Sequence, residues 1–151
     1  MRILSRMFLT LIAAALLNAA AVAQDPGVTA PAPVRIIVNA TNPVTSMTRS
    51  RIAKLFLKKT TKWDDGSKVL PVDQDQESPV RSDFSDVILN KSIAQVSSYW
   101  QQQIFSGRSM PPPVLVSDQA VAEFVKSNAG AIGYVSVSFE INDMKVLIVD
   151  E

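Results

Sequence analysis

The chain has 151 residues, with 15 basic and 14 acidic side chains, 47% hydrophobic residues, and neither cysteine nor histidine. A near-neutral charge without a basic stripe argues against a nucleic-acid partner. The missing cysteine and histidine exclude thiol nucleophiles, imidazole acid–base catalysis and ordinary zinc sites, and no cofactor is expected.

Residues 1–23 have the features of a secretory signal peptide. A start with two arginines precedes an apolar run over Met7–Leu17, and Ala21-Val22-Ala23 is a small-x-small cleavage site. The apolar run is too short for a membrane span, which predicts export to a periplasm with cleavage after Ala23. An uncleaved N-terminal anchor is the alternative. Residues 24–33 form a Pro/Ala/Gly-rich leader, and residues 34–151 form one domain.

The first half of that domain alternates strands with helices. Val34–Val38 is an almost unbroken apolar run, which predicts a strand buried on both faces of a parallel sheet. Thr48 is a helix cap, and the helix runs from Arg49 to about Leu57 with Ile52, Leu55 and Phe56 inward. Trp63, in the following loop, is interpreted as a packing anchor rather than a ligand platform.

The stretch from Lys68 to Leu89 is central to the interpretation. Val69–Val72 is a short strand, and Pro71 inside it indicates a sheet edge. A polar run then leads to Ser78-Pro79, where a hydroxyl cap and a first-position proline start a helix. The apolar positions of that helix recur at helical spacing and predict one buried face, made of Val80, Phe84, Val87 and Ile88.

The second half continues the alternation. Ser92 caps a helix to about Phe105, Val114–Val116 is a strand, and Ser117 caps a helix that ends at Asn128-Ala129-Gly130. Inward positions of the two helices are Ile93, Val96, Trp100 and Ile104, and Val121, Phe124 and Val125. The last strands are Ala131–Val135 and Lys145–Val149. The sequence predicts a single α/β domain whose helices cover a mostly parallel sheet.

Two helix starts are candidate anion sites. Thr48 and Ser78 are hydroxyl caps, and Arg49 and Arg81 place cations in the first turns, where an anionic ligand would offset their unfavourable interaction with the helix dipole. Parallel crossovers would bring both starts to one sheet edge. Arg81 could instead be solvated or paired with a carboxylate of the preceding polar run, namely Asp73, Asp75 or Glu77.

Other chemistry finds little support. Asp73, Asp75 and Glu77 alternate like a calcium loop, but Ser78 and Phe84 stand where that loop needs glycine and glutamate. No S-x-x-K pair or G-x-S-x-G elbow is present, so an enzyme is not expected. A pair of carboxylates acting as a hydrolase stays open, although nothing in the sequence places two of them across a cleft.

Four segments together resemble the phosphate-binding proteins of bacterial ABC uptake systems, and especially the short single-lobe members of the type II periplasmic binding protein superfamily. The segments are Thr48–Leu57, Trp63–Gly66, Val72–Ser78 and Asn128–Val135. The resemblance covers about residues 34 to 149. It implies one lobe of a type II periplasmic-binding-protein fold, with phosphate or a similar oxyanion as ligand.

The chain departs from the family at the expected phosphate loop. Gln74 replaces an arginine, Glu77 a glycine and Val80 a threonine, while the capping Ser78 is kept and Arg81 could supply the lost charge. Lys58 stands where the family has a helix-ending glycine, which predicts a later or less sharp helix end. The sequence therefore leaves two hypotheses: a domain that binds an oxyanion weakly or only in a complex, or a ligand-free module that binds an envelope protein.

Overall fold

The computed structural model describes residues 33–151. The predicted signal peptide and residues 24–32 of the predicted leader lie outside this range. Among the described residues, no helix has the length and apolar character needed to cross a membrane.

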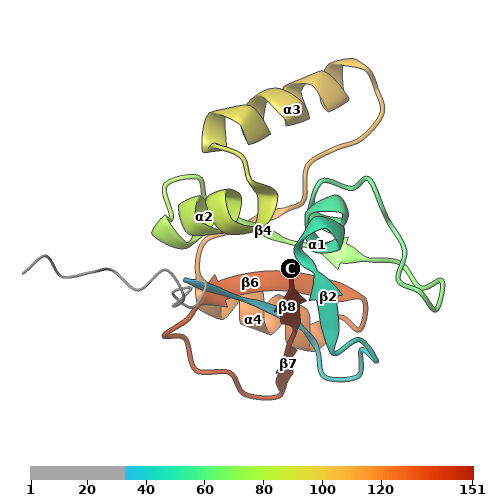
Figure 1. Cartoon of the computed structure of the whole chain (residues 1–151), viewed down its shortest axis with the longest axis vertical. Coiled ribbons are helices and arrows are strands. Elements are labelled where there is room, and N and C mark those ends of the chain that lie inside the picture. Colours follow the sequence, from blue (N-terminus) through green and yellow to red (C-terminus); the bar gives the residue numbers. More distant parts are fainter. Residues whose placement is uncertain (1–32) are drawn as a thin grey trace, which may run out of the picture. The chain divides into compact units, whose positions relative to one another are not determined.

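A four-stranded mixed sheet forms the centre of the domain (Figure 1). Its order is β3 (Leu70–Pro71), β6 (Ala131–Ser136), β1 (Val34–Asn39) and β7 (Met144–Val146). β3 runs parallel to β6, so Pro71 lies in an edge strand as predicted. β1 runs antiparallel to both of its neighbours, with Ile36 opposite Tyr134.

The direction of β1 corrects the prediction that Val34–Val38 pairs in parallel. Helices cover both faces of the sheet, so a central strand is apolar on both faces whatever its direction. The predicted α/β lobe is confirmed, and its parallel pairs are β3–β6 and two short ladders. These ladders join β2 (Ser46–Thr48) to β8 (Ile148–Asp150), and β4 (Asp73–Gln74) to β5 (Val114–Leu115).

One face of the sheet is covered by α1 (Arg49–Phe56), α2 (Pro79–Phe84) and the π-helical turn η1 (Ser85–Leu89), and α3 (Ile93–Phe105) lies farther from the sheet (Figure 1). Three aromatic rings form the middle of this core. Phe84 stacks on Tyr134 with ring centroids 3.9 Å apart, and Phe56 meets Phe84 edge-on at 4.6 Å. Such contacts add to the hydrophobic gain from burying the rings.

The other face of the sheet is covered by α4 (Asp118–Ser127). Val121 and Val125 of α4 are fully buried against Ile37, Val72 and Val135. Gly133 lies under α4, and an added Cβ would come within 2.5 Å of Val121 Cγ1. Glycine is therefore required there by close packing rather than by backbone conformation.

The predicted helix caps are mostly present. Thr48 Oγ1 accepts from the Arg51 amide and Ser117 Oγ from the Ala120 amide, while Ser92 forms a complete capping box with Gln95. Ser78 is the exception, because its side chain makes no cap hydrogen bond. It donates instead to Gln74 Oε1 at 3.1 Å.

The expected blurred end of α1 at Lys58 is wrong. Lys58 has φ +52° and Lys59 follows it; their amides donate to Leu55 O (3.1 Å) and Lys54 O (2.8 Å). This is the Schellman pattern, which closes a helix sharply. Lys58 thus adopts the left-handed conformation that glycine adopts without steric cost.

Side-chain burial follows most of the predicted faces. Ile104, expected inward, is 43% exposed at the end of α3, and four other residues expected inward are only half-buried, namely Val80, Val87, Ile93 and Phe124. Ile104 and Phe124 each line a cavity. Trp63 is buried and donates its indole N–H to Gly130 O at 3.1 Å, so its predicted packing role is confirmed.

Candidate functional site

A cavity of about 220 Å³ lies between the β4–β5 ladder and α3. Its walls are largely apolar side chains of α3 and of the prolines before β5, including Trp100 and Pro112. The polar lining consists of Asp73, Gln74, Gln76, Arg81, Ser97 and Gln101. Arg81 is the one cation among these lining residues.

Arg81 is the third residue of α2, and its side chain is not solvated, because it is only 3% exposed. α2 follows β4 through a short turn in which the Asp75 carboxylate accepts the Glu77 amide at 2.9 Å. Pro79 then starts the helix, and this places Arg81 back over β4. A buried guanidinium requires a compensating partner.

That partner is Asp73. Arg81 Nε lies 2.7 Å from Asp73 Oδ1, and the Asp73 side chain is 15% exposed. The contact is an ion pair, and Nε has no hydrogen-bond partner in the described structure. Arg81 also donates through Nη1 to Ser85 Oγ. Of the five N–H donors of the guanidinium, this is the one with a hydrogen bond to described residues.

Asp73 is also held by the core. The Tyr134 hydroxyl donates to Asp73 Oδ1 at 2.5 Å, and the Gln74 amide donates to the same oxygen at 2.9 Å. Burial raises the pKa of Tyr134 above its ordinary value of 10.0, and the negative charge of Asp73 raises it further. The tyrosine therefore stays a donor at physiological pH.

Gln74 is buried beside this pair and is committed to the fold. Its Nε2 donates to Asp118 Oδ1 at 2.8 Å and to Tyr134 O at 2.9 Å. The second oxygen of Asp118 accepts the Ser136 amide at 3.0 Å. Gln74 thus joins β4, α4 and β6, so its amide donors are already used.

The four predicted anion-binding residues do not gather at one place. Arg81 alone lines the cavity, and Ser78 lies just outside it. Thr48 caps α1, and Arg49 pairs with Glu151 at 2.7 Å beside a different cleft, which is lined by α1 and η1. The expectation of a shared sheet edge failed because α1 follows β2, which lies outside the central sheet.

Two contributors to the site escaped sequence reasoning. Tyr134 was seen only as part of the G-A-I-G-Y-V segment, and Asp118 only as a residue after a cap. Glu77, which stands where the family has a glycine, is exposed and does not line the cavity, whereas Asp73 does. In the described range, no group of three or more acidic side chains is arranged to hold a metal ion.

Comparison with known proteins gives consistent matches. The sequence profile of the PBP superfamily domain matches residues 30–150. The phosphate-binding protein PstS of Xylella fastidiosa is 30% identical over 109 residues, which cover 64% of this chain and 30% of that protein.

Solved structures match in fold. An ABC-type phosphate transport receptor from Vibrio cholerae has a TM-score of 0.60 at 20% identity, covering 76% of this chain and 45% of that one. PstS from Borrelia burgdorferi has a TM-score of 0.62 at 18% identity, covering 79% and 47%. The chain therefore spans about a third of the curated relatives it matches and less than half of these solved chains.

Proposed function

Because the chain belongs to the PBP superfamily, we propose that it is an exported, non-enzymatic solute-binding-like domain that holds phosphate or a similar oxyanion weakly. The relatives whose names state phosphate binding or transport support the ligand class. The match covers less than half of the length of these relatives, so a transporter partner is also only part of the proposal.

The observation that carries the ligand is Arg81. Its guanidinium lines the cavity of about 220 Å³, and it keeps N–H donors beyond the hydrogen bond to Ser85 and the ionic contact with Asp73. An oxyanion in the cavity would accept these donors, and charge-assisted hydrogen bonds are the strong class. The Ser97 hydroxyl and the Gln76 and Gln101 amides line the same space and can add further donors.

Asp73 explains why the binding should be weak. Its carboxylate lines the same cavity and already neutralises Arg81, so an entering anion meets little net positive charge. The cavity also opens to solvent, where charge pairs contribute less than in a closed site. We expect a dissociation constant in the millimolar range, which corresponds to about 4 kcal/mol of binding free energy.

Calorimetric titration of the purified protein with phosphate and with sulfate tests the proposal. Arg81→Lys keeps a charge beside Asp73 but loses the planar fork, so it should bind at least about ten-fold more weakly. Arg51→Ala is the matched control, because Arg51 is exposed and pairs with Asp64 away from the cavity. A flat isotherm up to about ten millimolar anion would remove the ligand from the proposal.

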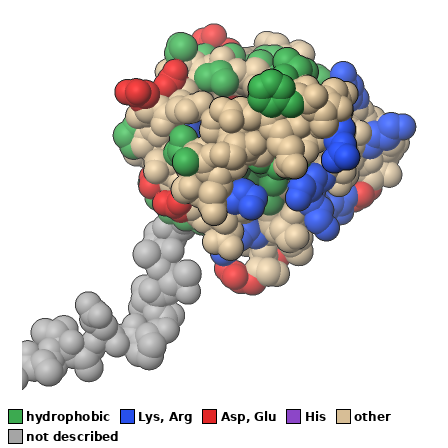
Figure 2. Space-filling model, turned by 90° about the horizontal axis from the view of Figure 1, so that it is seen from above, with side chains coloured by type: hydrophobic (Ala, Val, Ile, Leu, Met, Phe, Trp, Pro, Cys, Tyr) green, Lys and Arg blue, Asp and Glu red, His purple; other side chains and the backbone are tan. Residues whose placement is uncertain are grey.

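A second candidate function is a ligand-free module that binds an envelope protein. It is favoured by exposed apolar side chains around the end of α3 and β5, among them Phe105 (90% exposed), Val116 (86%) and Met110 (62%). Figure 2 shows hydrophobic side chains on the face of the domain seen from the α3 side. Pull-down from envelope extract with wild type and Phe105→Ser separates the candidates. A partner lost in the variant, together with a flat anion isotherm, would support this function over the first.

A further inference from the structure

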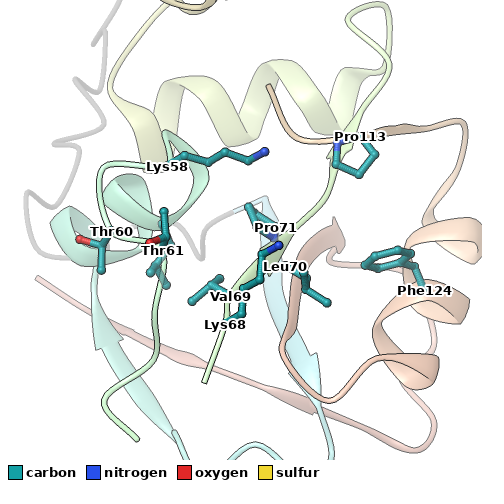
Figure 3. Close-up of a pocket in the computed structure, with 10 residues that line it drawn as sticks. Lys58, Thr60, Thr61, Lys68, Val69, Leu70, Pro71, Pro113 and Phe124 are labelled. Carbon is teal, nitrogen blue, oxygen red and sulfur yellow. The ribbon is translucent and has the colours of Figure 1, made fainter. Parts of the chain in front are cut away.

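A second cavity, of about 300 Å³, lies beside β3 and shares no lining residue with the site above (Figure 3). Its walls come from the end of α1, the strand leading into β3, the proline before β5, and α4. The apolar lining residues are Leu55, Val69, Leu70, Pro71, Pro113 and Phe124. A volume of this size falls in the range of small-molecule sites, which are mostly apolar with a few polar groups.

The polar groups of this cavity are two lysines and two threonines. Lys58 and Lys68 extend toward the middle of the space, and Thr60 and Thr61 stand on one side (Figure 3). No carboxylate lines the cavity, and none of the four ion pairs among residues 33–151 includes either lysine. The Lys58 ammonium has one long contact, a 3.3 Å hydrogen bond to Pro111 O.

The surroundings of Lys58 disfavour its positive charge. Burial lowers the pKa of Lys58 below its ordinary value of 10.5, and the positive charge of Lys68 lowers it further. Two cations that face one apolar space without a counter-ion repel each other. An anion placed between them would relieve the repulsion and would also offset the loss of solvation at Lys58, which is half-buried, whereas Lys68 is exposed.

The backbone at Lys58 adds an independent observation. The residue after the α1 cap has φ +52°, the left-handed region in which a side chain is strained and glycine is not. The chain nevertheless carries a lysine there, and its side chain reaches across the cavity (Figure 3). This left-handed residue closes α1, and the chain therefore places a lysine rather than a glycine at the point where α1 ends beside the cavity.

We propose that this cavity binds a small organic monoanion with an apolar body, such as an aryl or branched-alkyl carboxylate. Lys58 and Lys68 hold the carboxylate, and the body packs against Pro71, Pro113 and Phe124. The apolar walls distinguish this site from the Arg81 cavity. An inorganic anion alone would leave those walls in contact with water and gain nothing from them.

The test is a titration followed by two-dimensional amide NMR, with three probes. Benzoate has both the carboxylate charge and the apolar body. Benzamide is its neutral analogue, and acetate has the charge without the apolar body. Benzoate should shift the amide signals of residues 58–61 and 68–71 and of Phe124. It should bind at least ten-fold more tightly than either benzamide or acetate.

Three variants assign the binding to the lysines. Lys58→Gly suits the left-handed backbone, so the thermal midpoint should be kept or raised while benzoate affinity falls at least ten-fold. Lys68→Ala should also lower the benzoate affinity at least five-fold. Lys62→Ala, in the same loop but outside the cavity lining, should stay within two-fold of wild type.

Three results would overturn the proposal. One is equal affinity for benzoate and benzamide, which would mean that the charge is not recognised. Another is a set of shifted signals that lies away from the cavity. The third is a loss of benzoate affinity in Lys62→Ala as large as that in Lys58→Gly, which would indicate nonspecific attraction of the anion to the basic loop. Because phosphate is not a probe here, failure leaves the Arg81 proposal unaffected.

Discussion

Arg81 and Asp73 form a buried ion pair, with Nε and Oδ1 2.7 Å apart and side chains 3% and 15% exposed. Asp73 precedes the turn into α2 and Arg81 lies three residues into that helix, so the pair ties β4 to α2. The same carboxylate oxygen accepts the hydroxyl of Tyr134 from β6. The pair is therefore part of the core as well as the lining of a cavity.

Removing the cation should destabilise the fold. Arg81→Ala leaves the Asp73 carboxylate buried without its partner, which should cost about 3 kcal/mol or more of unfolding free energy. Arg51→Ala removes half of an exposed pair, with side chains 40% and 70% exposed, and should cost less than about 1 kcal/mol. Urea denaturation of both variants measures the contrast. Similar losses in the two would mean that the Arg81 pair is effectively solvated.

Removing the negative charge of Asp73 should strengthen the binding of an external anion to Arg81. Asp73→Asn keeps an oxygen acceptor for Tyr134 but leaves Arg81 without a counter-ion. Phosphate affinity should rise about ten-fold, or about 1.4 kcal/mol, and phosphate should raise the melting temperature more than in wild type. Calorimetry and thermal melts check both effects. Unchanged affinity would show that phosphate does not reach Arg81.

Alkaline pH should unfold the domain through Tyr134. Its folded pKa is raised above 10.0 by burial and by Asp73, so only the unfolded state loses the proton near pH 10. This contribution to stability is complete below pH 10 and falls as pH rises, by up to about 1.4 kcal/mol per pH unit.

Absorbance of tyrosinate against pH tests this directly, since the chain has two tyrosines. In Tyr99→Phe, the remaining tyrosine should titrate together with the loss of circular dichroism. A tyrosine that ionises near pH 10 while the fold persists would contradict the buried hydrogen bond.

Gly133 should tolerate no side chain. A Cβ would lie 2.5 Å from Val121 Cγ1 and 3.2 Å from Val72 Cγ2, so Gly133→Ala should cost about 1–3 kcal/mol by overpacking. At Gly66 an added Cβ meets nothing within 4 Å, so Gly66→Ala should cost less unfolding free energy, and that cost comes from the backbone angle φ +84° alone.

A second substitution distinguishes the two causes. Val121→Ala should partly relieve the loss in Gly133→Ala but should add fully to the loss in Gly66→Ala. Denaturant melts of the single and double variants give the coupling. Strict additivity at Gly133 would contradict a steric origin.

The positions of the elements follow from the sequence because the signals are local. The cap at Ser92 and the apolar spacing after it predict a helix to Phe105, and α3 spans Ile93–Phe105. The same holds for Thr48 before α1. The segment Asn128–Val135, with the three other segments of the resemblance, indicates the family, and the superfamily match over residues 30–150 confirms it.

The candidate site was only partly within reach of the sequence. The sequence indicates Arg81 either as an anion-binding residue, which stays a prediction, or as the partner of Asp73, Asp75 or Glu77, and it does not distinguish among these three carboxylates. The β4–β5 ladder decides between them, because it buries Asp73 against the core while Asp75 and Glu77 remain exposed on the turn.

The sequence by itself determined the order of the helices and the caps at Thr48, Ser92 and Ser117, since these depend on residues within a few positions of one another. Tertiary structure alone decided the antiparallel direction of β1, the meeting of Asp73 with Tyr134 across 61 positions, and the reach of Lys58 to Pro111 across 53. These contacts form when distant segments pack to remove apolar surface from water. The spacing of apolar residues within one segment does not determine which distant segment it will pack against.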